Sequence, residues 1–427
     1  MRNRLHLQIL IALLLGVGAG LLWPEGRTIW GDIQPYSVFD FVGTLFLRAL
    51  KMVIVPLIAG SIISGVAGVG SSRGLGRLFG RTFAWYVSTS LMAILVGLFL
   101  VNLIQPGIQG GEPVGPRLGL SRPDPQLSAE LEGRGAGDLV DIVQRMIPTN
   151  PVAAAAEGQM LPLIFFCLLF GIAVGSLGEQ QRAAQFAFWE SLFVVMMRIT
   201  GWVIRAAPVG IFGLMAKITA ASGFAAFGPL LQYGGTVLAA LVIHAAITLP
   251  LLVRVVGGLP PHRHAQVMAP ALLTAFSTRS SSATLPLTMD RIENGAGVSN
   301  RVTSFVLPLG ATINMDGTAL YECVAALFIA QAYGVELGIG SQVVVVFTAL
   351  LASIGAAGIP AAGLVMISII LDAVGLPLEG IALILAVDPV LDMFRTAVNV
   401  WSDSCGAVVI ARREGEEGIL VREADRG

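Results

Sequence analysis

The chain has 427 residues, of which 55% are hydrophobic and only 12% are charged, about half the ~25% charged share of an ordinary soluble domain. Its 26 basic and 27 acidic residues leave a formal net charge of −1, so there is no basic surface field for a nucleic-acid backbone. The composition excludes a soluble globular protein and a nucleic-acid-binding protein, and it indicates a polytopic α-helical membrane protein.

Eight apolar segments are each long enough to cross a bilayer, which takes about 20 apolar residues. In chain order they are 5–23, 38–69, 76–104, 140–178, 184–218, 227–256, 299–332 and 380–411. Eight crossings place both ends of the chain on one side, and most Arg-rich connections fall on that side. The positive-inside rule therefore predicts a multi-pass protein of the cell membrane with both termini in the cytoplasm.

Two polar stretches lie outside these crossings. Residues 106–137 are rich in Gly, Pro and charged side chains and have no apolar periodicity, a composition typical of irregular connections. We expect a mobile extracellular loop there. The end of the chain, 414–427, mixes Glu, Arg and Asp, and we expect a solvated cytoplasmic tail.

Two further regions, 265–296 and 341–376, each consist of two apolar arms around a short break. The first break is Ser280 to Ser282 and the second is 353–358. Each arm is too short to cross a bilayer, and irregular backbone at membrane depth is tolerated only where it is buried or lines a wet cavity. We predict re-entrant hairpins, with a kinked single span as the alternative at each place. Since each hairpin precedes a long helix with polar residues, the pattern favours the inverted repeat of secondary transporters.

The last predicted helix has a polar stripe along an arc about 100° wide. Its members are Asp388, Asp392, Arg395, Thr396, Asn399 and Asp403. An ionised side chain in a membrane helix costs roughly 2.5 to 3.5 kcal/mol, so four of them indicate a site or an ion pathway. The alternative is a ladder of ion pairs that joins two helices, but three acids against one base leave negative charge that favours cations.

The seventh crossing contains the run 314–318, Asn-Met-Asp-Gly-Thr, at its centre. Helix interiors disfavour Asn, Asp and Gly, so we expect an unwound turn whose oxygens form a cage for sodium. The alternative is a notch for close helix packing. Glu322 follows one turn later as a further carboxyl within the predicted crossing, and we expect it to serve either as a proton carrier or as a paired structural group.

The third crossing contains a cluster of hydroxyl side chains, Tyr86, Ser88, Thr89 and Ser90. Hydroxyls within a span either bind a ligand or bond to their own backbone. The histidines have no partner at a metal-ligand spacing, and the sequence assigns no role to His244.

Four segments together resemble the dicarboxylate/amino acid:cation symporter family, which includes archaeal aspartate transporters and animal excitatory amino acid transporters. These segments are Thr278–Pro286 (TRSSSATLP), Gly310–Glu322 (GATINMDGTALYE), Ala352–Pro360 (ASIGAAGIP), and Asp392–Thr396 (DMFRT) with Asn399. The resemblance extends over nearly the whole chain.

The resemblance implies an all-α membrane fold of eight transmembrane helices plus two re-entrant helical hairpins, arranged as inverted repeats in a homotrimer within the lipid bilayer. A fixed scaffold would consist of 1–75 and 138–222. The parts that move as an elevator-type transport domain would be 76–105, 223–258 and 259–413.

The resemblance also implies roles for single residues. Arg395 would bind the side-chain carboxylate of aspartate or glutamate, since its planar fork suits a carboxylate, and Thr318 would add a hydrogen bond. Asp392 would receive the α-ammonium and Asn399 the α-carboxylate, with Thr396 nearby. The hairpin tips that would close over this ligand are Arg279, Ser280, Ser281 and Ser282 in the first hairpin and Ile359, Pro360, Ala361, Ala362 and Gly363 in the second.

Three sodium sites are implied in the same way. The first would use Gly310, Asn314, Asn399 and Asp403; the second Thr312, Ser353, Ile354 and Ala356; the third Tyr86, Thr89, Ser90, Asn314 and Asp316. Where relatives usually have Gly, this chain has Ser402, and we expect its side chain to crowd or reshape the sodium site. Tyr321-Glu322 resembles the animal carriers, in which this Glu goes with proton and potassium coupling, so H+ and K+ are further candidate ions.

The resemblance implies a sodium-coupled symporter of L-aspartate or L-glutamate and not an enzyme. The alternative is a proton-coupled symporter of glutamate or of a C4-dicarboxylate, and a substrate without an amine would leave Asp392 unpaired. A magnesium-diphosphate transferase would need a second carboxylate-rich helix. A passive channel is disfavoured by the charged, ligand-sized site.

Overall fold

The computed structural model describes residues 5–26, 34–67, 76–118, 120, 147–157, 159–223, 227–355, 362–385 and 387–421. This part of the chain is almost entirely helical. Its strands are β1 (Ile108–Gln109) and β2 (Glu112–Pro113), which pair antiparallel in one short hairpin. The helical class predicted from composition is confirmed.

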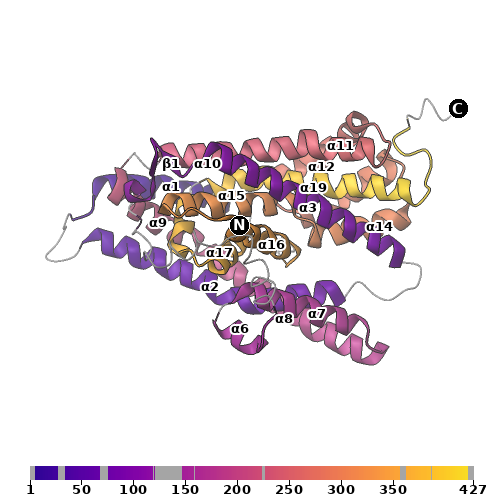
Figure 1. Cartoon of the computed structure of the whole chain (residues 1–427), viewed down its shortest axis with the longest axis horizontal. Coiled ribbons are helices and arrows are strands. Elements are labelled where there is room, and N and C mark those ends of the chain that lie inside the picture. The colour runs from indigo at the N-terminus through magenta and orange to yellow at the C-terminus, as the bar shows by residue number, and fades with distance from the viewer. Residues whose placement is uncertain are drawn as a thin grey trace.

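One group of helices runs along the lower side and the left end of the molecule as drawn in Figure 1. Its members are α1 (Leu5–Leu22), α2 (Pro35–Ala67), α6 (Pro151–Glu157), α7 (Met160–Gly175), α8 (Glu179–Arg205) and α9 (Ala207–Ser222). α1 packs mainly on α9, and α2 packs on α7, α8 and α9. Small residues allow the backbones to approach closely: a Cβ at Gly16 of α1 would lie 2.8 Å from the carbonyl oxygen of Phe212.

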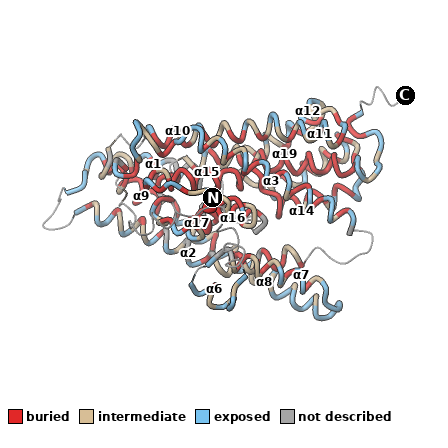
Figure 2. Tube along the Cα trace, in the orientation of Figure 1, coloured by how far each residue is buried: buried red, intermediate tan, exposed pale blue. Residues whose placement is uncertain are grey.

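A second group surrounds α15 and contains the long helices in the upper part of Figure 1. Its members are α3 (Gly76–Ile104), α10 (Phe227–Ile243), α11 (Leu249–Val255), α12 (Pro261–Thr278), α13 (Ser281–Asp290), α14 (Asn300–Ile313), α15 (Asp316–Tyr333) and α19 (Asp388–Arg413). Every residue of α15 except Gln331 is buried. In Figure 2 the buried residues are concentrated along α15 and α19, at the centre of this group.

Between the two groups lie α16 (Ile339–Gly355) and α17 (Ala362–Val374), which pack on each other and contact α2 and α7. The short segments that complete the description are the π-helices His244–Thr248 and Arg291–Gly295, the 3-10 turns Gly115–Leu118 and Leu378–Gly380, and α18 (Ile381–Ile384).

The predicted crossings 5–23, 38–69, 76–104 and 227–256 agree with α1, α2, α3 and the α10–α11 helix to within about three residues, and each of the other four contains two helices or begins elsewhere. The crossing 140–178 contains two helices, α6 and α7, which begin at Pro151 and Met160. The crossing 299–332 consists of α14 and α15, separated at Asn314 and Met315, where the expected unwound turn occurs. The crossing 184–218 is two helices, because Pro208 starts α9. The last helix begins at Asp388 and not at residue 380.

The first hairpin turns earlier than predicted. Arg279 has the left-handed conformation (φ 53°) that ends α12, and Ser280 caps α13 by accepting a hydrogen bond from the backbone N–H of Ala283 at 3.2 Å. Ser281 and Ser282 therefore belong to the first turn of α13. In the second region α16 continues through Gly355, so 353–355 are helical, while 356–361 lie outside the described residues.

Four helices in the described part are long and apolar enough to cross a membrane. They are Arg77–Ile104, Glu179–Val203, Gly228–Val255 and Asn300–Tyr333. Many outward-facing side chains are large and apolar, including Phe41, Phe99 and Leu231, which are 67%, 65% and 71% exposed. Such a surface is unfavourable in water and suits contact with lipid.

The part of the predicted solvated tail that the structure describes, residues 414–421, packs in part against the rest of the molecule, and 422–427 lie outside the described residues. The backbone N–H of Leu420 donates to the carbonyl of Ala296 at 2.8 Å, and Arg263 donates to the carbonyl of Leu420 at 3.3 Å. Glu414 pairs with Arg81 at 2.5 Å. Residues 414–421 thus contact the N-terminal parts of α3, α12 and α14. The apolar side chain of Leu420 is buried in this contact, which stabilises it.

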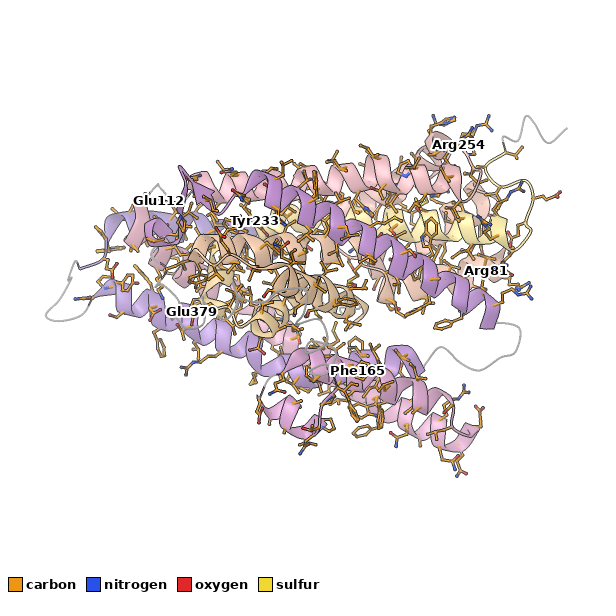
Figure 3. All side chains as sticks on the ribbon, in the orientation of Figure 1. Arg81, Glu112, Phe165, Tyr233, Arg254 and Glu379 are labelled. Atoms are coloured by element: carbon orange, nitrogen blue, oxygen red, sulfur yellow. The ribbon has the colours of Figure 1, made fainter. Side chains whose placement is uncertain are left out.

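The loop predicted after the third crossing begins with ordered structure. The backbone N–H of Gly107 donates to Gln331 at 3.1 Å, and β1 and β2 follow. Gly115 lies so close to α15 that a Cβ there would be 2.2 Å from the carbonyl oxygen of Ala332. Residue 119 and residues 121–137 of this loop lie outside the described part. Arg81 and Arg254 lie at the end of the molecule near the C-terminal segment, and Glu112 and Glu379 lie toward the opposite end (Figure 3).

Candidate functional site

The helix break between α14 and α15 lies at the centre of the site. Asn314 has an extended backbone and Met315 precedes the first turn of α15. Asn314, Asp316 and Gly317 have weak helix propensity, so the chain can leave the helix here at little cost. The break places Asn314 and Asp316 beside α3 and α19, in the buried interior.

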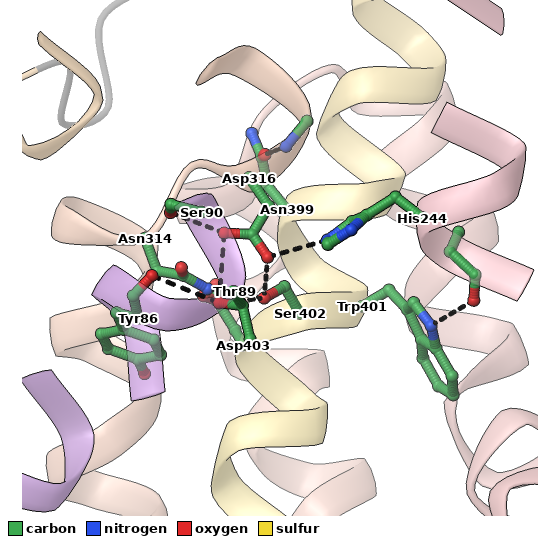
Figure 4. A network of polar contacts seen from close by, with 12 residues as sticks. Tyr86, Thr89, Ser90, His244, Asn314, Asp316, Asn399, Trp401, Ser402 and Asp403 are labelled. Carbon is green, nitrogen blue, oxygen red and sulfur yellow. Dashed lines mark hydrogen bonds and ion pairs between the residues drawn. The ribbon is translucent and has the colours of Figure 1, made fainter. Parts of the chain in front are cut away.

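The carboxylate of Asp316 is surrounded by donors from three other elements (Figure 4). Its Oδ1 accepts from Ser90 at 2.6 Å and from Thr89 at 3.3 Å, both on α3. Its Oδ2 accepts from Ser402 of α19 at 2.6 Å and lies 3.1 Å from Nε2 of His244. All five side chains are buried. We call this set of residues the Asp316 cage.

A second carboxylate, Asp403, lies next to it. Its Oδ1 accepts from Nδ2 of Asn314 at 2.8 Å. A Cβ at Gly310 would lie 2.5 Å from this oxygen and 2.6 Å from the hydroxyl of Tyr86, so only glycine leaves room there. Tyr86 itself donates to the carbonyl of Val306 at 2.7 Å. We call Asp403, Asn314, Gly310 and Tyr86 the Asp403 cage.

The donor set of the two cages suits a hard cation. Two buried carboxylates this close together are unfavourable unless positive charge is nearby. Oδ1 of Asn314 is buried and has no hydrogen-bond partner within the described part of the chain. The atoms that could coordinate an ion are carboxylate, amide and hydroxyl oxygens, which suit an alkali or alkaline-earth ion. Among the described residues, no group of three His, Cys, Asp or Glu side chains could hold a metal ion.

Asn399 bonds to the first turn of α15, and no hydrogen bond joins it to Asp403 among the described residues. Its Oδ1 accepts from the backbone N–H of Gly317 at 2.8 Å, and its Nδ2 donates to Thr318 at 3.2 Å. Gly317 is in close contact with α19, because a Cβ there would lie 2.6 Å from the carbonyl oxygen of Arg395. Asn399 therefore links the first turn of α15, which holds Asp316, to the polar stripe of α19.

The residues expected at the second sodium site are only partly described. Thr312 donates to the carbonyl of Leu309 at 2.8 Å, and Ser353 donates to that of Leu350 at 2.8 Å. Each hydroxyl is therefore bonded to its own helix. The backbone of Ile354 lies in the last turn of α16, and Ala356 lies outside the described residues.

Arg395 is the largest fully buried side chain of the molecule's described part. Its Nη2 lies 2.8 Å from Asp392 and 3.1 Å from Asp388, and its Cζ lies 3.9 Å from the ring centroid of Tyr321. This pairing stays within α19 and does not join two helices, as the ladder considered from the sequence would. It leaves Nε and Nη1 without a hydrogen-bond partner among the described residues, and a Cβ at Gly363 of α17 would lie 2.3 Å from Nη1.

The hairpin tips and the remaining expected ligand residues are only partly described. Thr396 donates to the carbonyl of Asp392 at 2.8 Å. Arg279, Ser280 and Ser281 are half-buried, and Ser282 is exposed. Ala362 opens α17, whereas 359–361 lie outside the described residues.

Glu322 lies one turn beyond Thr318 on α15 and is fully buried. Neither of its carboxylate oxygens has a hydrogen-bond partner among the described residues. An unpaired carboxylate is very unfavourable in such surroundings, and a protonated carboxyl is much less so.

Sequence reasoning missed His244 and underestimated Ser402. His244 starts a π-helical turn inside the α10–α11 helix, and the carbonyl of Ala245 in this turn accepts from Trp401 at 3.0 Å. π-turns are frequent at functional sites, but no motif in the sequence predicted this π-turn. His244 and Asp316 are 72 positions apart in the chain. Motif spacings describe residues of one helix or turn, so they could not predict this contact.

Comparison with known proteins gives a family and several relatives. The model of the sodium:dicarboxylate symporter family matches residues 5–413. The proton/glutamate-aspartate symporter of Escherichia coli is 35% identical over 95% of this chain and 92% of its own length. Mouse excitatory amino acid transporter 3 is 38% identical over 98% and 87%. The proton/sodium-glutamate symport protein of Geobacillus stearothermophilus is 32% identical over 96% and 94%.

Proposed function

Because the chain belongs to the sodium:dicarboxylate symporter family, we propose that it is a secondary active symporter that takes up L-aspartate or L-glutamate together with sodium ions. It is a multi-pass membrane transporter and not an enzyme. Relatives over nearly the full length are named for glutamate and aspartate transport with protons or sodium. The observation that carries the sodium assignment is the pair of buried carboxylates together with the unpartnered oxygen of Asn314, whose amide nitrogen bonds to Asp403.

The substrate assignment rests on Arg395 and Asp392. These two side chains form an ion pair with each other at 2.8 Å, and an acidic amino acid has groups that match both. Its side-chain carboxylate would take the place of Asp392 on the guanidinium, and its α-ammonium would take the place of Arg395 on Asp392. Thr318, Thr396 and Asn399 would hold the remaining polar atoms. A C4-dicarboxylate without an amine would leave Asp392 without a cation.

Coupling between ions and substrate follows from the first turn of α15. A cation at Asp316 would fix this turn, whose next residues, Gly317 and Thr318, are the hydrogen-bond partners of Asn399. The substrate-binding residues would thus be ordered only when the cages are neutralised. Once the ion has ordered this turn, the protein loses less conformational entropy when the substrate binds. The ion therefore raises the affinity for the substrate, which is positive cooperativity.

We further infer an elevator mechanism in a homotrimer. The scaffold would be 1–75 and 138–222, and the moving transport domain would be 76–105, 223–258 and 259–413. In support, the first group of helices (α1, α2 and α6 to α9) packs mostly within itself, and so does the group around α15. Eight crossings with cytoplasmic termini fit the position of Arg81 and Arg254 at the end near the C-terminal segment (Figure 3).

Proton coupling is the second candidate, and Glu322 favours it. This carboxyl is buried without a hydrogen-bond partner among the described residues, so it could be neutral in one step of the cycle and charged in another. Potassium counter-transport would use the same residue.

The deciding experiment uses purified protein reconstituted in liposomes. Uptake of radiolabelled L-aspartate is measured with an inward sodium gradient and, separately, with a proton gradient alone. We expect uptake to require sodium. Uptake driven equally well by protons alone would overturn sodium coupling and assign the driving force to Glu322.

A further inference from the structure

Ser402 lies at the centre of the polar network in Figure 4. It is fully buried. Its hydroxyl donates to Oδ2 of Asp316 at 2.6 Å and accepts from Nδ2 of Asn314 at 3.0 Å. Because a hydroxyl has one proton, the short bond to Asp316 takes it, and the 3.5 Å contact with Thr89 is a weak one. Ser402 is therefore an oriented bridge between two other polar side chains.

The amide of Asn314 is oriented by this bridge. A primary amide has two N–H donors and one carbonyl oxygen. Nδ2 of Asn314 uses one donor on Ser402 and the other on Asp403, at 3.0 and 2.8 Å. Its Oδ1 is then held on the opposite side of the amide, where it is buried and unpartnered within the described part of the chain. Without the hydroxyl, only one of the two N–H groups keeps an acceptor, and the amide is free to rotate.

The same contacts form one continuous chain of hydrogen bonds from the Asp316 cage to the Asp403 cage. In order, the chain is Asp316, Ser402, Asn314 and Asp403. Every member is buried, so these bonds are stronger than they would be in water. A cation that fixes Asp316 and Asn314 also fixes the donor that Asp403 receives.

We propose that Ser402 is a positioning residue for sodium: it holds the carbonyl oxygen of Asn314 toward the ion and couples the two cages, so that sodium ions bind cooperatively. This inference rests on the sodium coupling proposed above. The first ion orders the hydrogen-bond chain, and the second ion then loses less conformational entropy on binding. The effect concerns ion binding and does not require the amino acid to be present.

Ser404 provides a matched control on the same helix. It is also fully buried, and its hydroxyl donates to the carbonyl of Trp401 at 2.8 Å and contacts His264 at 3.0 Å. These contacts lie outside both cages. Both hydroxyls are buried on α19, but only that of Ser402 touches the residues that would bind ions.

The test measures the Tm of the purified protein, without amino acid, over a series of sodium concentrations at constant ionic strength made up with choline. Binding to the folded state raises Tm by mass action. In Ser402→Ala we expect the sodium concentration for half of the Tm rise to increase about tenfold, the effect of one lost hydrogen bond to a charged group. The Hill coefficient should fall toward one. The Tm of Ser404→Ala should rise with sodium as that of the parent does. In choline, without sodium, we expect the two variants to have similar Tm values.

The outcomes separate this inference from the proposed function. If the Tm of the parent rises with sodium and Ser402→Ala has the same midpoint and Hill coefficient, the role of Ser402 is overturned. The proposed sodium coupling is then unaffected. A parent whose Tm does not respond to sodium overturns the sodium coupling and this inference with it. If Ser402→Ala is not obtained folded, Ser402→Gly also lacks the hydroxyl and is expected to show the same weakened, less cooperative response.

Discussion

Nη2 of Arg395 lies 2.8 Å from Oδ1 of Asp392, which stands one turn earlier on the same helix. The pair is nearly enclosed, since Arg395 is buried and a Cβ at Gly363 would meet its guanidinium. A ligand with both a carboxylate and an ammonium can replace each partner of this pair, whereas a ligand with only one charge leaves the other residue unpaired. In the proposed function, selection of an acidic amino acid would therefore be a competition between this internal ion pair and a matched external one.

Asp392→Asn should weaken the binding of L-aspartate about 100-fold at saturating sodium, because the ammonium loses its only charged partner in this arrangement. Calorimetric titration of the purified protein measures this affinity. Asp290→Asn is the matched control, since Asp290 pairs with Arg291 at the end of α13, outside the site. Unchanged affinity in Asp392→Asn would place the ammonium elsewhere.

Arg395→Cys should abolish the binding of acidic amino acids and admit neutral ones, since the side-chain carboxylate loses its bidentate partner. The measurement compares uptake of radiolabelled aspartate and of a neutral amino acid such as serine or cysteine. The sodium-induced rise in Tm serves as the control and should persist. Aspartate uptake at the parental rate would rule out this role for Arg395.

Gly310→Ala should raise the sodium concentration needed for half-maximal stabilisation by at least tenfold. The added Cβ would lie 2.5 Å from Oδ1 of Asp403 and 2.6 Å from the hydroxyl of Tyr86, so the cage must open. Gly235→Ala on α10 is the control, because nothing lies within 4 Å of a Cβ there. The two variants are compared in sodium titrations of Tm. An equal response of both would remove the Asp403 cage from ion binding.

Glu322→Gln should flatten the pH dependence of uptake if this carboxyl exchanges a proton during the cycle. The amide keeps the shape of the side chain but cannot ionise. The uptake of L-aspartate is measured from acidic to alkaline pH in liposomes. Glu379→Gln at the exposed turn before α18 should keep the parental profile. A Glu322→Gln profile that follows the parent's would assign this residue a structural role.

Leu420→Ala should lower stability by about 2 to 4 kcal/mol, because a buried side chain is removed from the contact between the C-terminal segment and the first hairpin. The Tm in a single buffer measures this loss. Val421→Ala is the neighbouring control, since Val421 is 37% exposed. Equal Tm values for the two variants would mean that the segment contributes little to the fold.

The sequence by itself determined the helical membrane class, the break at Asn314 and Met315, and the polar stripe of α19. Each depends on local physics: the insertion cost of charge in an apolar helix, weak helix propensity, and the period of 3.6 residues. The same local reasoning placed the first hairpin turn one or two residues late. There it could not distinguish a serine that caps a helix, Ser280, from the serines of the helix's first turn.

Only the tertiary structure decided which of these polar residues meet. Ser90 and Asp316 are 226 positions apart, His244 and Asp316 are 72 apart, and Leu420 returns to Ala296 across the end of the molecule. Periodicity shows which side chains share the face of one helix. It does not show which faces meet, because this depends on where glycines let backbones approach and where a π-turn redirects a side chain. The cages around Asp316 and Asp403 exist because five separate elements pack at one point: α3, the π-helical turn that His244 starts, α14, α15 and α19.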